Sequence, residues 1–424
     1  MLFPQEALER SMKVRDVITR ALSGQYSWIQ AAEILGLSPR SVRRWRWRME
    51  RFGETGLIDM RRGRPSPKRV RPDEIQRVLA LYRDRYQGFN CRHFHQVACR
   101  DHAVKMSYSL LKQILQAAGL IRRGRSRGPH RRRREPRACF GEMLHIDGST
   151  HRWLSLDPES KQTMIAIVDD ATKRLLYAQL FPAESTEAVM RGLRAVISKH
   201  GIPAALYSDR ARWAFVTPKA GGDVDRDQLT QVGRALSRLG IEHIPSYSPQ
   251  ARGRIERLNR TLQDRLVNEL RVAGVRTMEA ANRYLYERFI PEYDQTFAHV
   301  PREPESAFVP LQGFDLEQVL CHEEERTVGR DNTVALFGIT LQIDKQPGRR
   351  TCAARRVLVR RHLDHTFSIW IGSRCLGTYS ADGRPNRPVE AAGPVDAGNG
   401  PGAHKDLGRR PNRRRRPQLP QAPL

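Results

Sequence analysis

Gly141-Glu-Met-Leu-His-Ile-Asp-Gly-Ser149 opens the stretch of sequence that decides the fold. Its apolar run predicts a strand over residues 143–146, and comparable runs follow it along the chain. Further strands are expected at 163–168, 175–181, 204–207 and 241–245, with helices at 185–200 and 228–239. Three strands in succession, followed by an alternation of helix and strand, predict a mixed sheet with helices packed on it.

Two acidic residues lie where these strands end. Asp147 directly follows the first strand, and Asp209 comes just after the strand at 204–207. If those two strands are neighbours in the sheet, both carboxylates meet at one edge. Folding alone gives no reason for charged groups at the ends of apolar runs, so their presence indicates a site.

A third acid, Glu256, opens an amphipathic helix. It lies about 100° round from Ile255, at the edge of an apolar stripe that continues with Leu258, Leu262 and Leu266. Asn259, Arg260 and Gln263 share its face. A glutamate in a first helical turn is, on its own, explained by its favourable interaction with the helix dipole. Its coincidence with the two strand-end aspartates instead favours a cation site.

Three acids of this kind point to chemistry on phosphodiesters. Hard divalent ions such as Mg²⁺ prefer oxygen ligands, and carboxylates supply them. Two such ions about 4 Å apart can activate an attacking oxygen while stabilising the leaving one. Asp147, Asp209 and Glu256 therefore suggest a metal-dependent nuclease.

The composition indicates a polyanionic partner. The 424 residues include 74 Lys and Arg against 46 Asp and Glu, a formal net charge of +28, and most of the excess lies in the first 140 residues. A hydrophobic content of 39% is enough for globular cores. No apolar run reaches the roughly 18 residues of a membrane span and no signal peptide is evident, so we expect a cytoplasmic protein. The six cysteines form no CxxC pair, which predicts free thiols.

Residues 1–60 are expected to form a helix-turn-helix domain. A helix with Ala31, Ile34 and Leu35 on one face ends at Gly36, and Ser38 and Pro39 begin a second helix. Val42, Trp45 and Met49 would face inward, which leaves five arginines for DNA: Arg40, Arg43, Arg44, Arg46 and Arg48. A plain helical hairpin with a solvated charged face is the alternative, and the charge of the whole segment disfavours it.

The rest of the first third alternates linkers with a second helical unit. A basic, proline-rich linker spans 61–72 and includes Arg62 and Arg64, and its Gly-Arg-Pro element resembles minor-groove hooks. Residues 73–121 predict a second helix-turn-helix domain. Cys91, His93, His95 and Cys99 match no common zinc spacing, so we assign no metal there. A second linker, 122–138, carries the run Arg131, Arg132, Arg133 and Arg134, which is suited to backbone phosphates.

Four motifs, in order along the chain, carry a family resemblance: Leu144-His-Ile-Asp-Gly-Ser, Ile167-Val-Asp-Asp-Ala-Thr-Lys-Arg, Tyr207-Ser-Asp-Arg and Ser248-Pro-Gln-Ala-Arg-Gly-Arg-Ile-Glu-Arg-Leu-Asn. With them the chain resembles bacterial insertion-sequence transposases with an integrase-type catalytic core, from the first helix-turn-helix to about residue 308. The resemblance implies a ribonuclease H-like fold over 139–310, two Mg²⁺ or Mn²⁺ ions, and an Asp, Asp, Glu triad that falls on Asp147, Asp209 and Glu256.

In such enzymes a metal-activated water cuts the transposon end, and the freed 3′-hydroxyl attacks target DNA. Double-stranded DNA and further copies of the same chain, as a homodimer or higher oligomer, are the implied partners. Arg254 and Arg260, within the last motif, are expected to contact DNA. The 47 positions between Asp209 and Glu256 exceed the spacing in many relatives, which predicts an insertion around residues 218–227.

Other acids in the core have more ordinary explanations. Asp169 and Asp170 lie between two strands, where aspartate favours turns by bonding to the backbone. Asp223, Asp225 and Asp227 lack the later glycine and glutamate of a calcium loop, so we expect them to be solvated. His145 points to the same side of its strand as Asp147, either as a packed histidine or as a support for the acid.

The last third combines a small β domain with a basic tail. Short alternating segments separated by Gly and Asp turns predict a small β-barrel over 325–380. Residues 381–424 are rich in Gly, Pro and Arg and are expected to be disordered. The leading hypothesis is a DNA transposase. Its rivals are an inactive or domesticated DNA-binding regulator, and a structure-specific nuclease that cuts DNA without joining it.

Overall fold

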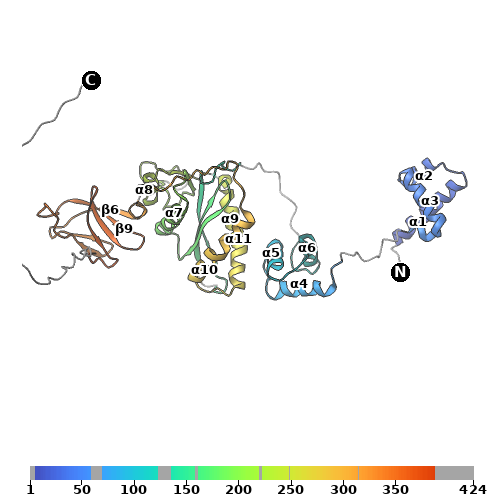
Figure 1. Cartoon of the computed structure of the whole chain (residues 1–424), viewed down its shortest axis with the longest axis horizontal. Coiled ribbons are helices and arrows are strands. Elements are labelled where there is room, and N and C mark those ends of the chain that lie inside the picture. Colours follow the sequence, from blue (N-terminus) through green and yellow to red (C-terminus); the bar gives the residue numbers. More distant parts are fainter. Residues whose placement is uncertain are drawn as a thin grey trace, which may run out of the picture. The chain divides into compact units, whose positions relative to one another are not determined.

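A computed structural model describes residues 5–58, 69–122, 135–157, 161–218, 222–247, 249–313 and 315–386 (Figure 1). Most of each predicted linker, including Arg62, Arg64 and Arg131 to Arg134, falls outside these ranges, as does nearly all of the predicted tail. The chain divides into two compact units, Met1–Pro129 and His130–Leu424, which are considered separately. In the described part of the chain, no helix is long and apolar enough to cross a membrane.

The first helical group forms the predicted helix-turn-helix. Ser27 caps its second helix in a reciprocal capping box with Gln30, and Gly36 ends that helix in the left-handed region, with φ at 62°. Ser38 accepts a hydrogen bond from the Ser41 amide, and Pro39 occupies the first position of the third helix. The group comprises α1 (Gln5–Leu22), α2 (Trp28–Leu35), α3 (Pro39–Phe52) and a 3₁₀ helix, η1 (Gly53–Leu57).

The core of this group depends on α1, a helix beyond those expected from the sequence. Val14, Val17 and Ile18 of α1 pack against Ala31 and Ala32 of α2 and against Val42 and Leu57. Trp45 and Met49 are partly buried against the same core, as their spacing predicted.

Three helices form the second group: α4 (Pro72–Asp84), α5 (Cys91–Asp101) and α6 (Tyr108–Ala117). Asn90 caps α5 and Ser107 caps α6, each by accepting a hydrogen bond from a backbone amide of the first turn. The helical character expected over 73–121 is confirmed, and its assignment as a DNA-binding helix-turn-helix stays a prediction.

The central sheet has the mixed topology predicted from the sequence, with strand order β3-β2-β1-β4-β5. The three strands on one side pair antiparallel, and β4 and β5 continue the sheet in parallel from β1. This order makes β1 and β4 neighbours, which was the condition for bringing the two aspartates together. The strands are β1 (Leu144–His151), β2 (Gln162–Asp169), β3 (Leu175–Phe181), β4 (Ala205–Ser208) and β5 (Glu242–Pro245).

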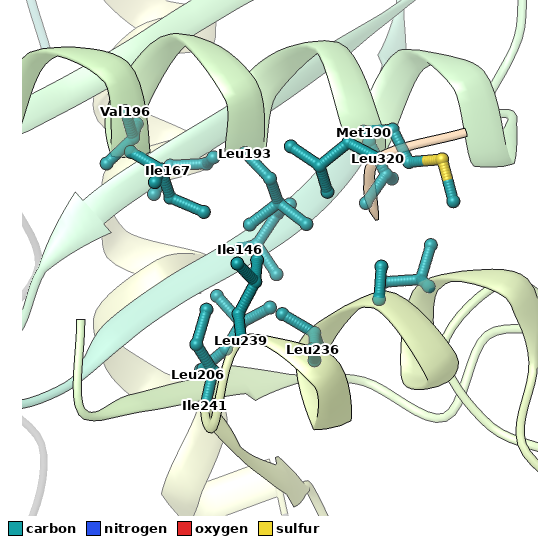
Figure 2. Packing of buried hydrophobic residues seen from close by; sticks show 14 of the residues in the cluster. Ile146, Ile167, Met190, Leu193, Val196, Leu206, Leu236, Leu239, Ile241 and Leu320 are labelled. Atoms are coloured by element: carbon teal, nitrogen blue, oxygen red, sulfur yellow. The ribbon is translucent and has the colours of Figure 1, made fainter. Parts of the chain in front are cut away.

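Helices cover both faces of this sheet, so β2 is buried along its whole length. Alternate side chains of β2 enter different cores: Ile165 and Ile167 face α7 and α8, and Met164 and Ala166 face α9. Figure 2 shows the first of these cores, with Ile146 between α7 and α8. The helices are α7 (Thr186–His200), α8 (Gln231–Arg238), α9 (Pro249–Val272), α10 (Met278–Tyr284), the π-helical turn η2 (Leu285–Phe289), and α11 (Ile290–Phe297).

The carboxyl-terminal domain is an open sheet, and the predicted small β-barrel over 325–380 is not confirmed. Four strands pair antiparallel in the order β11-β10-β9-β6, and β7 pairs only with β8. In residues 315–386, no ladder joins that hairpin to the end strands, so no closed barrel forms. The hairpin instead contributes Val334 and Leu341 to a core shared with Val359 and Ile369 of the sheet. The elements are α12 (Leu316–Val319), β6 (His322–Thr327), β7 (Thr333–Leu336), β8 (Ile339–Gln342), β9 (Arg356–Arg361), β10 (Phe367–Ile371) and β11 (Arg374–Tyr379).

A charged cluster fastens this domain to the central one. The Glu323 carboxylate, whose side chain is 8% exposed, lies 2.7 Å from Arg238, 2.8 Å from Arg360 and 3.2 Å from Arg234. Beside it, Leu316, Val319, Leu320 and Leu363 join the core between the central sheet and α7 and α8. Burial lowers the pKa of Arg234, which shows how far this cluster is withdrawn from water.

Replacing Glu323 with alanine should destabilise the protein by about 3 kcal/mol, because three arginines would lose the one carboxylate they share. The measurement is urea unfolding, followed by the fluorescence of the buried tryptophans. Glu325→Ala is the matched control, since Glu325 is 74% exposed, and it should change stability by less than about 0.5 kcal/mol. Equal stability of the two variants would show that the cluster does not fasten the domain.

Candidate active site

Asp147 lies in the middle of β1, on the face of the sheet that α9 covers. It is 7% exposed, and its Oδ2 accepts a hydrogen bond of 2.7 Å from Nδ2 of Asn259 on α9. One turn further along α9, Gln263 donates to the Ser149 hydroxyl over 3.0 Å. Two successive residues on the Asp147 face of β1 are thus tied to one face of α9.

Asp209 lies one residue beyond β4, beside Asp147. The parallel register pairs Leu144 with Leu206 and His145 with Tyr207. Continuing it by two residues brings Asp209 alongside Asp147, on backbones about 5 Å apart. Oδ1 of Asp209 accepts a hydrogen bond of 3.1 Å from the Ala211 amide, which orients the carboxylate at the start of the next turn.

Glu256 is exposed on the first part of α9. It precedes Asn259 by three residues, so it shares the helix face that contacts β1 one turn later. Ile255 and Leu258 are buried in the core below, as the predicted stripe required. β1 continues to His151, so Asp147 lies within the strand and not at its end, as had been expected. The pairing of β1 with β4 still sets Asp147 alongside Asp209, and α9, which carries Glu256, packs over β1.

The side chains do not form a closed ligand cluster. In the described residues, no three His, Cys, Asp or Glu side chains lie close enough together to hold a metal ion, so the triad as a metal site stays a prediction. The three acids would still suit a hard cation, because their donor atoms are carboxylate oxygens. In addition, Oδ1 of Asn259 is a buried oxygen for which the structure records no hydrogen-bond partner.

Two bulky residues that follow Asp209, Arg210 and Trp213, contact other parts of the chain. Trp213 packs into the core on the opposite face of the sheet and donates a hydrogen bond of 2.6 Å to Glu184. The Arg210 guanidinium stacks over the Tyr247 ring at 5.1 Å. In the predicted insertion, a β-bridge joins Val216 to Asp225.

Glu184 is another acid beside β1 that sequence reasoning missed, and it lies on the face of the sheet opposite to Asp147. Its carboxylate lies so close to Gly148 that a Cβ on that glycine would approach it to 2.8 Å. Gly148 is the neighbour of Asp147 on β1, so a side chain at this position would require the Glu184 carboxylate to move. Glu184 follows β3 in a segment without a strand or helix motif, which is why its position gave no signal.

His145, Asp169 and Asp170 form a buried network at the start of β1. His145 Nε2 lies 2.7 Å from Asp170 Oδ1, and both side chains are almost fully buried. Asp169 accepts hydrogen bonds from the Gly141 amide and from the amide and hydroxyl of Thr172. Burial raises the pKa of Asp169. The interpretation of Asp169 as a turn-building residue is confirmed.

A second buried histidine supports the strand that leads to Asp209. His243 of β5 lies 2.9 Å from the Ser208 hydroxyl, and its ring stacks on Phe215 at 4.0 Å. Burial lowers the pKa of His243 to about 4. The folded protein therefore holds this ring neutral.

We expect the folded protein to lose stability in acid as His243 becomes protonated. The folded-state pKa of His243 lies below the unfolded value near 6.5, so its contribution is complete above about pH 6.5 and is lost as the pH falls towards 4. Between pH 7 and 4.5 this amounts to about 2 kcal/mol. Urea unfolding of the wild type and of His243→Gln at both values measures it, and parallel pH dependence of the two proteins would contradict the assignment.

On the first helical group, the five arginines predicted to contact DNA differ in exposure and in their contacts within the protein. Arg40, Arg43 and Arg44 are exposed on α3. Arg46 pairs with Glu50 and stacks over Trp28. Arg48 donates to the Ile58 carbonyl and stacks over Trp45.

DNA contact by these five arginines stays a prediction. Neighbouring aromatic rings and a carbonyl engage Arg46 and Arg48 in this structure. On α9, Arg260 is exposed, and the side chain of Arg254 lies outside the described residues.

Comparison with known proteins adds sequence relatives. A family model described as a helix-turn-helix domain matches residues 15–66. The chain is 32% identical over 368 residues to the protein named "Putative transposase y4bF" of Sinorhizobium fredii (strain NBRC 101917 / NGR234), covering 86% of this chain and 79% of that one. It is 28% identical over 319 residues to the transposase for insertion sequence IS1202 of Streptococcus pneumoniae, covering 67% of each.

Among the solved structures with detectable similarity are two of viral proteins. One is the HTLV-2 integrase catalytic core domain in complex with magnesium, in its dimeric form, at 14% identity and a TM-score of 0.26 over 35% of this chain and 88% of that one. Another is the simian T-cell lymphotropic virus intasome in complex with PP2A regulatory subunit B56 gamma, at 13% identity and a TM-score of 0.31 over 64% of this chain and 88% of that one.

Proposed function

Because this chain belongs to the transposases of bacterial insertion sequences, we propose that it binds the ends of its own mobile element, cuts them, and joins the freed 3′-hydroxyl to target DNA. The observation that carries the chemistry is the pairing of β1 with β4, which sets Asp147 beside Asp209 under the helix that bears Glu256. The net charge of +28 supports DNA as the substrate.

In this proposal Asp147, Asp209 and Glu256 hold two divalent cations, Mg²⁺ or Mn²⁺. Such ions lower the pKa of an attacking water or hydroxyl and neutralise charge on the phosphate. The residues of the chain position these acids. Asn259 fixes one oxygen of Asp147, and the Gln263–Ser149 hydrogen bond holds α9 against β1. The burial of Asp147 limits access of bulk water to the reacting centre.

Recognition of the element ends falls to the first helical group. Arg40, Arg43 and Arg44 supply base-edge and phosphate contacts from α3, and Arg260 supplies a contact beside the acids. A mobile element has two ends, so we propose a homodimer or higher oligomer on DNA, acting in the cytoplasm.

The decisive experiment incubates the purified chain with its element ends, Mg²⁺ and a target plasmid. We expect cleavage at the ends and covalent joining to the plasmid. Pre-cut ends that terminate in a 3′-dideoxynucleotide are the matched control, because they lack the attacking hydroxyl and should not be joined. Binding without cleavage would support a DNA-binding regulator, and cleavage without joining would support a nuclease.

A further inference from the structure

A cavity of about 220 Å³ opens on the α9 side of the central sheet, next to the acids. Part of its wall is apolar and aromatic, and is formed by Val168 from β2, Leu258 from α9, and Tyr293 and Phe297 from α11. It is smaller than the 300–1,000 Å³ pockets that enclose drug-sized ligands, so it suits a single ring system.

A buried histidine in the cavity wall lacks a hydrogen-bond partner on one nitrogen. His145 is 1% exposed, and its Nδ1 is a buried atom for which the structure records no partner. Its Nε2 lies 2.7 Å from the Asp170 carboxylate, so Nδ1 is the ring nitrogen that remains for a further partner. A buried polar nitrogen without a partner favours a ligand that brings a hydrogen-bonding edge into the cavity.

Basic groups surround the same cavity. Lys173 and His299 line it, with Lys173 Nζ 2.8 Å from His299 Nε2, and Arg257 lines it from α9. Lys173 adopts a φ of 60°, a left-handed conformation that is uncommon outside glycine. Asp169 also lines the cavity, but its carboxylate is already held by the Gly141 amide and by Thr172. An aromatic cavity with a basic lining fits a planar ring that carries an anionic group.

The cavity is also close to the candidate active site. His145 and Asp147 lie two residues apart on the same face of β1, which corresponds to about 7 Å along the strand. A group bound in the cavity therefore lies beside the DNA that the acids would cut.

We propose that this cavity receives one unpaired base of the DNA strand next to the cleaved phosphate. The base stacks on the aromatic wall that Tyr293 and Phe297 form together, with its hydrogen-bonding edge towards His145, while Lys173 and Arg257 contact its phosphate. This inference rests on the proposed function, because it takes the element end as the ligand. It adds a nucleotide-binding position that the three acids do not provide.

The test measures binding without divalent metal, so that it does not depend on strand cutting. Element-end duplexes are prepared fully paired, or with a single unpaired nucleotide placed in turn at each position around the cleavage point. The wild type should bind one of the unpaired forms at least about tenfold more tightly than the fully paired duplex, because no base pair has to be opened.

Thr296→Trp, which fills the mouth of the cavity, should abolish this preference and leave the affinity for paired DNA unchanged. Gln295→Trp is the matched control, since it adds the same ring to the neighbouring exposed position of α11 and should keep the preference.

A second readout identifies the contact directly. 5-Iodouracil at the preferred position, and in a short single-stranded oligonucleotide, should crosslink on irradiation to Tyr293 or Phe297. Equal binding of paired and unpaired ends, a preference that survives Thr296→Trp, or crosslinks confined to other elements would each overturn the inference. The proposed function is tested separately: it would fail if the protein neither cut nor joined intact element ends in Mg²⁺.

Discussion

Replacing Asp147 with asparagine should lower both strand cutting and strand joining by at least about 1,000-fold. The substitution keeps the shape of the side chain and leaves an oxygen to accept the hydrogen bond from Asn259, so the packing of α9 on β1 should survive. What is lost is the negative charge that a divalent cation needs. The rates of cleavage and joining in Mg²⁺ measure the effect, and affinity for element ends in the absence of metal should be unchanged.

The same loss is expected for Asp209→Asn and Glu256→Gln, since each removes one charged ligand from the proposed triad. Asp223→Asn is the matched control, because Asp223 is exposed in the insertion, and it should cut at the wild-type rate. Wild-type cleavage by Asp147→Asn would remove that residue from the mechanism, and wild-type cleavage by all three variants would remove the triad.

The second large effect concerns recognition of the element ends. The double substitution Arg43→Ala and Arg44→Ala should weaken binding to these ends about 100-fold or more, and should reduce the dependence of log Kd on log salt by about 2. Both side chains are exposed on α3, so the fold of the first helical group should not change. Fluorescence anisotropy with labelled ends at several salt concentrations measures both quantities.

Arg10→Ala with Lys13→Ala provides the control. It removes the same charge from exposed positions of α1, and it should weaken binding only slightly. If both double variants lose affinity equally, general electrostatic attraction rather than α3 directs binding.

Local patterns in the sequence were sufficient for most of the central domain. The apolar runs located all five strands, and the Ser and Pro caps located α3, because these features act over a few residues. The helix α1 was not predicted, although its sequence carries the same helical spacing of apolar residues as the helices that were. The residues with that spacing are Val14, Val17, Ile18 and Ala21. Local patterns did not predict that β1 and β4 are adjacent strands, and this pairing was learned from the structure.

Features that depend on contacts between residues far apart in the sequence were harder to predict. Arg46 and Arg48 look like DNA contacts on a helical wheel, and the wheel does not include Trp28 or the Ile58 carbonyl. Glu184 reaches Gly148 only because the chain returns after β3. Alternating segments predicted strands in the last third, but closure of a barrel depends on which end strands pair, and alternation carries no information on that.

The position of Leu316, Val319 and Leu320 has a practical consequence for anyone preparing the catalytic region alone. A fragment that stops at residue 310 retains every acid of the proposed triad, but it uncovers the apolar surface of α7 and α8 that these leucines and valine fill. Exposed patches of this kind promote aggregation. An expression fragment that is to remain soluble should extend through the open sheet to residue 386.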